Sequence, residues 1–92
     1  SISNKLEFMQ YKWLWLNGTT DWKPYNVRQA KTIEQAYRAK QTSVDIKNIT
    51  RLADDKQNDY RVVFNSPFEN LAPYTQINLV TGYKRGVKRE EV

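Results

Sequence analysis

Residues 13–25 read WLWLNGTTDWKPY, and this stretch decides the fold that the sequence predicts. Tryptophan alternates with leucine in its first four residues, and the alternation of bulky side chains extends back towards residue 7, which is the period of a β-strand. The polar segment 17–21 contains a glycine and is typical of a turn. We therefore predict a β-hairpin whose second strand covers residues 22–25.

The segment from residue 27 to about residue 40 carries the clearest helical pattern. Asn26 can cap this helix, and Gln29 lies three residues later, as in a capping box. The apolar side chains recur at the spacing of one helix face: Val27, Ala30, Ile33, Ala36 and Tyr37. Because this apolar stripe is narrow, we expect the helix to pack on a sheet and not on a membrane.

The remainder of the chain favours short strands. A loop is expected at 65–73, which contains two prolines, and a polar turn at 54–59. The strands are predicted at 43–46, 49–52, 60–64, 74–80 and 83–89. One helix among about six strands predicts an α+β domain with an antiparallel sheet.

Length and composition limit the chemistry of the chain. Its 92 residues leave room for one domain, 1–92, with a core at about 7–90, and the start at Ser1 suggests a fragment of a larger protein. Cysteine and histidine are absent, which excludes disulfides, thiol nucleophiles, Ser–His catalysis and most zinc sites. No apolar run is long enough for a membrane span, and no signal peptide is evident, so we expect an intracellular protein.

Charge and aromatic content point to a class of ligand. The formal net charge is +5, and the chain holds three tryptophans, six tyrosines and three phenylalanines. Basic and aromatic side chains together suit a ligand with phosphates and flat rings, such as a nucleotide or a nucleic acid. The alternative is that the aromatic residues form the core and the charge serves solubility.

The last predicted hairpin brings polar side chains together. If residues 81–82 form a two-residue turn, Asn78 lies opposite Arg85, and both share one face of the sheet with Gln76. A glutamine amide fits the edge of a base, and an arginine fork fits a phosphate. Alternatively, this face is simply exposed to water. Because threonine disfavours the left-handed conformation, a three-residue turn with a bulge would shift the pairing.

The chain resembles the WWE domain over nearly its whole length. The resemblance rests on the pattern W-x-W-L-N-G-x-x-x-W-x-P-Y at 13–25 and on Q-x-N-x-x-T-G-x-x-R-x-V-x-R at 76–89, with Glu34 as the family's glutamate. It implies a strongly curved antiparallel half-barrel of about six strands packed around one α-helix. Trp13 and Trp22 are then expected in the core, with their indole N–H groups bonded to the backbone, and Glu34 is expected to be structural.

The resemblance also implies a ligand site at one open end of the half-barrel. The ligand-binding residues of the family match four positions of this chain: Trp15, Tyr60, Gln76 and Arg85. The two aromatic rings would line or stack on an adenine, the glutamine would read its edge, and the arginine would meet a phosphate. The alternative for Trp15 and Tyr60 is a place in the core. Asn78 is expected to support a turn.

Several features bear on whether such a site works. Lys84, Lys88 and Arg89 either add positive potential or form a solvated edge that discourages strand pairing. Lys23 stands where some binding members have a second aromatic residue, and the 66–73 loop could cover the site or block it. The sequence ends at Val92, so we expect no further basic residue for a second phosphate, which weakens the case for the internal unit of the polymer and leaves a terminal ADP-ribose open.

The function that the resemblance implies is non-catalytic. It is the recognition of ADP-ribose units, either terminal ADP-ribose or the iso-ADP-ribose of poly(ADP-ribose), on modified proteins. Such a module would recruit an attached catalytic domain, as in ubiquitin ligases and poly(ADP-ribose) polymerases, in the nucleus or cytoplasm. We expect no cofactor, metal or membrane partner, and a neighbouring WWE or catalytic domain is a further partner. The alternatives are a structural or protein-interaction WWE domain with an incomplete pocket and, less favoured, single-stranded RNA binding.

Overall fold

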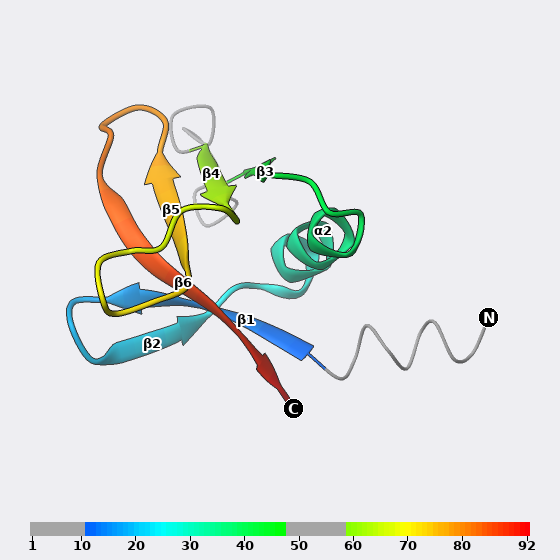
Figure 1. Ribbon diagram of the computed structural model, residues 1–92, viewed down its shortest axis with the longest axis horizontal. Helices are drawn as coiled ribbons and strands as arrows, with labels where there is room; N and C mark the ends of the chain where they lie inside the picture. Colours follow the sequence, from blue (N-terminus) through cyan, green and yellow to red (C-terminus); the bar gives the residue numbers. More distant parts are fainter. Residues whose placement is uncertain (1–10, 48–58) are drawn as a thin grey trace.

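The computed structural model describes residues 11–47 and 59–92. These residues form one antiparallel sheet with the strand order β2-β1-β6-β5-β4-β3, together with the helix α2 (Val27–Arg38) (Figure 1). The strands are β1 (Tyr11–Asn17), β2 (Asp21–Pro24), β3 (Ser43–Ile46), β4 (Tyr60–Val63), β5 (Tyr74–Asn78) and β6 (Lys84–Glu91). In the described part of the chain, no helix is long and apolar enough to cross a membrane.

The sheet curls around α2. The helix contacts β3, at one end of the sheet, and also β1, which lies next to the other end. A flat sheet of six strands could not bring both ends to one helix, and Figure 1 shows α2 held in the hollow between them. The prediction of an α+β half-barrel around one helix is therefore confirmed. We call the face of the sheet towards α2 the concave face and the opposite face the convex face.

The helix begins where the sequence predicts. Asn26 Oδ1 accepts from the backbone N–H of Gln29 at 2.7 Å, and Gln29 Oε1 accepts from the backbone N–H of Asn26 at 3.4 Å, which completes the capping box. Ile33 is fully buried, as its spacing predicts. Val27 is 86% exposed, so the prediction that it belongs to the apolar face is wrong. The sheet does not cover the first residues of the helix, where Val27 lies.

Aromatic side chains fill the concave face. Trp13 is 1% exposed, and its ring lies 5.4 Å from that of Tyr37, 5.7 Å from that of Tyr74 and 5.8 Å from that of Phe64, centroid to centroid. Such tilted and edge-on aromatic pairs contribute beyond their buried area. The remaining buried core side chains come from α2, from the strands and from the connection between β2 and α2: Tyr25, Ile33, Ile46, Val62 and Val87.

The position of Trp22 differs from the predicted one. It is half-buried and lies outside the core, on the convex face opposite Leu16. The ammonium of Lys88 lies 4.4 Å from the centroid of its ring. Since β2 is at the edge of the sheet, Trp22 has neighbours on one side only. The predicted strand 49–52 and most of the predicted turn 54–59 lie outside the described residues.

The two strands of the last hairpin pair in a register that differs from the predicted one by two residues. Gln76, and not Asn78, lies opposite Arg85. The reason is that the backbone N–H of Asn78 donates to the carbonyl of Tyr83 at 2.8 Å, which leaves a loop of four residues, 79–82. In this loop Asn78 Oδ1 accepts the backbone N–H groups of Val80 at 2.8 Å and Thr81 at 3.1 Å. Because the shift is an even number of residues, each side chain keeps its predicted face. Asn78 therefore supports a turn, as expected.

The 66–73 loop lies on the convex face. A Cβ added to Gly86 would come within 2.8 Å of Ala72 Cβ and 3.2 Å of Phe68, and Ala72 is buried. Gly86 thus allows the loop to pack closely on the centre of the sheet. The loop neither covers nor blocks the concave face, because its proline-bounded turn directs Phe68 and Ala72 onto the opposite side.

Candidate functional site

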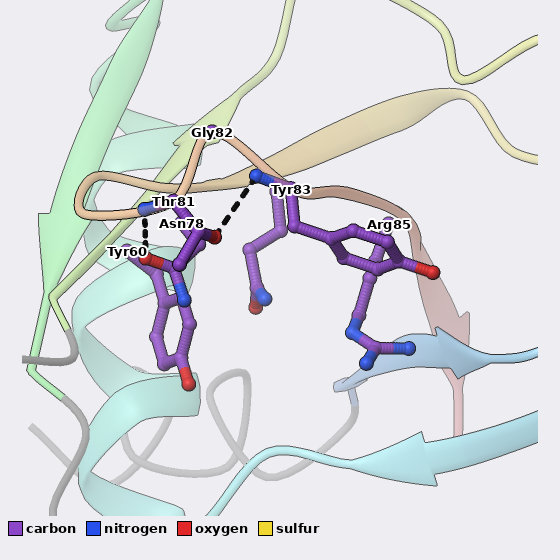
Figure 2. Close-up of a pocket in the computed structure, with 7 residues that line it drawn as sticks. Tyr60, Asn78, Thr81, Gly82, Tyr83 and Arg85 are labelled. Atoms are coloured by element: carbon purple, nitrogen blue, oxygen red, sulfur yellow. Dashed lines mark hydrogen bonds between the residues drawn. The ribbon is translucent and has the colours of Figure 1, made fainter.

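A cleft of about 680 Å³ opens at one end of the half-barrel (Figure 2). This volume lies within the range of ~300–1,000 Å³ that is typical of small-molecule sites. The start of β4, the end of β5 and the start of β6 meet at this end of the sheet, together with the hairpin that joins β5 and β6. The lining residues are Tyr60, Gln76, Asn78, Thr81, Gly82, Tyr83 and Arg85.

Gln76 is the most buried side chain of the cleft, at 5% exposed. Its carbonyl oxygen accepts from the hydroxyl of Tyr25 at 2.5 Å. Tyr25 is also buried, and its backbone N–H donates to the carbonyl of Trp13 at 3.0 Å. Burial, with a smaller effect of the nearby Tyr60, raises the pKa of Tyr25, so its hydroxyl keeps its proton. The hydrogen bond from the buried Tyr25 therefore fixes the amide of Gln76 in place.

Arg85 is held between two aromatic rings. Its guanidinium carbon lies 5.3 Å from the ring centroid of Trp15 and 4.9 Å from that of Tyr83. One nitrogen of the fork donates to the carbonyl of Leu16 at 3.4 Å. A guanidinium stacked on aromatic rings keeps its N–H edge available for an anion while its faces are shielded.

Of the four predicted site residues, three line the cleft and one does not. Tyr60, Gln76 and Arg85 converge there from three strands that are neighbours in the sheet. Trp15 is half-buried, packs against the core and reaches the cleft only through the guanidinium of Arg85. In this structure Trp15 lies behind Arg85, on the strand β1 that pairs with β6, and its assignment to the ligand site stays a prediction.

Besides the turn residues Thr81 and Gly82, the side chains of Tyr83 and Tyr25 were not predicted as part of the site. Tyr83 lines the cleft and is 60% exposed. Its alternation with Arg85 on the last strand was a signal that both share a face. Tyr25 was placed only at the end of a strand, and nothing local in the sequence indicates its bond to Gln76, which is 51 residues away.

Lys23, Lys84 and Lys88 do not reach the cleft. Lys23 is exposed on the edge strand and pairs with Asp21 at 3.5 Å. Lys84 lies on the convex face, where it borders a hollow beside Phe68, and Lys88 covers Trp22 on that same face. The expectation that Lys84, Lys88 and Arg89 form a solvated edge of the sheet is wrong, because β6 is hydrogen-bonded to β1 on one side and to β5 on the other.

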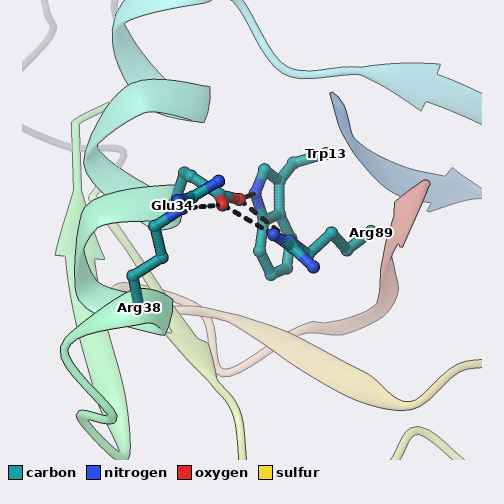
Figure 3. A network of polar contacts seen from close by, with 4 residues as sticks. All are labelled: Trp13, Glu34, Arg38 and Arg89. Atoms are coloured by element: carbon teal, nitrogen blue, oxygen red, sulfur yellow. Dashed lines mark hydrogen bonds and ion pairs between the residues drawn. The ribbon is translucent and has the colours of Figure 1, made fainter. Parts of the chain in front are cut away.

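Glu34 joins the helix to two strands through a buried network (Figure 3). Its carboxylate accepts from the indole N–H of Trp13 at 2.8 Å and from Arg89 at 2.7 and 3.0 Å, in a bidentate pair. Arg38 donates to the same carboxylate at 2.5 Å. Glu34 is structural, as expected, but the indole of Trp13 bonds to this carboxylate and not to the backbone.

Arg89 is therefore not a surface charge. Its side chain is 19% exposed, and its guanidinium carbon lies 3.5 Å from the ring centroid of Tyr11 and 4.6 Å from that of Tyr37. Two aromatic rings and the carboxylate of Glu34 thus surround the guanidinium. The expectation that Arg89 adds free positive potential near the ligand is wrong.

The Glu34 network predicts a loss of stability in acid. Burial would raise the pKa of Glu34, but hydrogen bonds from Arg89, Arg38 and Trp13 lower it from 4.5 to about 2. Because the unfolded chain takes up this proton first, the contribution of Glu34 is complete above about pH 4.5 and is lost as the pH falls towards 2. We expect this carboxylate alone to cost the protein roughly 2 kcal/mol between pH 7 and pH 3.

Urea unfolding at pH 7 and pH 3 measures this loss. The Glu34→Gln variant cannot titrate at this position, so its free energy of unfolding should change less between the two pH values than that of the wild type. Equal changes in the two proteins would contradict the lowered pKa of Glu34.

Comparison with known proteins agrees with this architecture. A family model for the WWE domain matches residues 11–89, which include the helix and every described strand except the last two residues of β6. A search of curated proteins finds no match to the chain. Since the family match covers most of the 92 residues and the half-barrel is the fold that the resemblance implies, the chain belongs to the WWE domain family.

Proposed function

We propose that this chain is a non-catalytic module that binds ADP-ribose units in the cleft between β4, β5 and β6. It would recruit an attached catalytic domain to proteins that carry such units. The observation that carries the proposal is the convergence of Tyr60, Gln76 and Arg85 on one cleft, on a WWE framework.

The polar groups of the cleft suit the two ends of a nucleoside diphosphate. The amide of Gln76 can pair with the edge of a base through one donor and one acceptor. The N–H edge of Arg85 can bind a phosphate bidentately, and charge-assisted hydrogen bonds are roughly twice as strong as neutral ones. Gln76 and Arg85 lie directly opposite each other on β5 and β6, so one ligand can contact both.

The aromatic side chains suit the base. Tyr60 and Tyr83 both line the cleft, and Tyr60 lies on the strand next to Gln76. Stacking of a base on an aromatic ring contributes ~1–3 kcal/mol in nucleic-acid complexes. Because Arg85 occupies the Trp15 side, we assign base stacking to Tyr60 and phosphate binding to Arg85.

Calorimetric titration of the chain with ADP-ribose and with iso-ADP-ribose tests the proposal. Chemical-shift mapping with the tighter ligand should move the amide resonances of 60, 76 and 78–85 and leave those of 68–72, on the convex face, unchanged. A ligand at 100 times its dissociation constant should also stabilise the fold by ~2.7 kcal/mol. The ratio of the two affinities shows which part of the polymer is read.

Two results would redirect the proposal. No binding of either ligand, in the calorimeter or in the melting temperature, would favour the protein-interaction alternative. Binding of single-stranded RNA that weakens steeply with salt, without preference for a diphosphate, would favour the nucleic-acid alternative.

A further inference from the structure

The hydrogen bond between Tyr25 and Gln76 orients a group that faces the cleft. The two oxygens are 2.5 Å apart, which is within the range for O–H···O bonds and too short for an N–H···O bond. The carbonyl of Gln76, and not its NH₂ group, is therefore the end that meets Tyr25. Both side chains are buried, Tyr25 at 8% exposed and Gln76 at 5%, so water does not compete for this contact.

The other end of the amide faces the cleft. Within residues 11–47 and 59–92, no side-chain or backbone acceptor binds the amide nitrogen of Gln76, and this nitrogen is not among the buried polar atoms left without a partner. It is therefore open to the cleft that Gln76 lines. The carbonyl oxygen has a second lone pair beside it. The bond to Tyr25 thus fixes the order of donor and acceptor along the amide.

The order of donor and acceptor selects between purines. An adenine edge offers an amino donor next to a ring-nitrogen acceptor, which matches an amide in one orientation. A 6-oxo purine offers a carbonyl acceptor in place of the amino group, so this acceptor would face the acceptor of Gln76. An amide that is free to rotate by 180° could satisfy either base.

We infer that Tyr25 is a positioning residue that fixes the orientation of the Gln76 amide and makes the cleft selective for 6-amino over 6-oxo purines. This inference rests on the proposed binding of ADP-ribose and adds the base selectivity of the site and the residue that sets it. Tyr25 comes from the connection between β2 and α2, and Gln76 from β5, so the contact also ties that connection to the floor of the cleft.

Tyr25→Phe removes the hydroxyl and keeps the ring. The probes are ADP-ribose and its deaminated analogue, inosine diphosphate ribose, each titrated into the wild type and the variant. In the wild type we expect ADP-ribose to bind at least roughly tenfold more tightly, as for a bidentate contact that discriminates between bases. In Tyr25→Phe the ratio should fall to about twofold or less, while affinity for ADP-ribose falls several-fold.

Tyr74→Phe is the matched control. It removes the hydroxyl of a different tyrosine, which is half-buried in the aromatic core and does not line the cleft. The ratio of the two affinities should stay at the wild-type value in this control. An unchanged ratio in Tyr25→Phe, with both ligands weakened equally, would overturn the inference and leave Tyr25 a purely structural residue.

A measurement without ligand separates this inference from the proposed function. In the wild type, the side-chain NH₂ resonances of Gln76 should be resolved and ordered on the picosecond–nanosecond timescale, and in Tyr25→Phe they should lose that order. If the wild type binds no ADP-ribose, the proposed function fails while this result still decides the role of Tyr25. A Gln76 amide that is mobile in the wild type contradicts that role.

Discussion

Replacement of Glu34 by alanine is expected to lower the free energy of unfolding by about 3–5 kcal/mol. The substitution leaves the guanidinium of Arg89 held between two aromatic rings without its counter-charge, and it removes the acceptor of the Trp13 indole. A chain of this length has a total stability of about 5–14 kcal/mol. The variant should therefore lose about a fifth of this stability or more, as measured by urea unfolding followed by tryptophan fluorescence.

Glu90→Gln is the control for the charge that is removed. Glu90 pairs with Lys88 at 2.7 Å and Lys12 at 3.8 Å, but its side chain is 40% exposed. Exposed ion pairs contribute ~0–1 kcal/mol, so this variant should unfold close to the wild type. A loss of less than about 1 kcal/mol in Glu34→Ala would contradict the view that the network holds α2 to β1 and β6.

Replacement of Arg85 by alanine is expected to weaken ADP-ribose binding by about 10- to 100-fold, provided that the cleft is the site. The substitution removes the cation of the cleft and the fork that Trp15 and Tyr83 hold in place. It should leave the melting temperature almost unchanged, because the one hydrogen bond of this side chain to the backbone is long, at 3.4 Å. Isothermal titration with ADP-ribose measures the loss of affinity.

Arg61→Ala is the matched control for net charge. Arg61 lies on β4, on the convex face, and its guanidinium is bound to Asp45 at 2.7 Å. Removal of this charge should change the affinity by less than about twofold, because a screened charge on the far face acts only weakly. Arg85→Lys should fall between the wild type and Arg85→Ala, since it keeps the charge but not the fork. Equal affinities of Arg85→Ala and the wild type would remove Arg85 from the site.

The elements of the fold could be predicted because their signals are local. The alternation at 13–16 and the Asn26–Gln29 capping box each depend on residues within one turn or one strand, and both are confirmed. The register of the last hairpin could not be read in the same way. It depends on the side chain of Asn78, which bonds to the following backbone and lengthens the turn.

The site could be predicted in part for a related reason. Gln76 and Arg85 share a face for any even shift of register, so the error in pairing did not separate them. The partners of Arg89 and Gln76 could not be predicted from local sequence. Glu34 lies 55 residues from Arg89, and Tyr25 lies 51 residues from Gln76. Without a fold, an arginine near the end of a chain cannot be distinguished from a solvated charge.

The 66–73 loop lies on the convex face and the cleft uses the opposite face, so the side chains of these two surfaces can be changed independently. Its packing depends on Gly86 and Ala72, whereas the cleft depends on side chains of the opposite face. Exposed positions such as Glu69 and Asn70 are thus suitable places for a fluorophore or an affinity handle. A chain immobilised there would present its cleft to the solution, which is the orientation that a capture reagent for modified proteins requires.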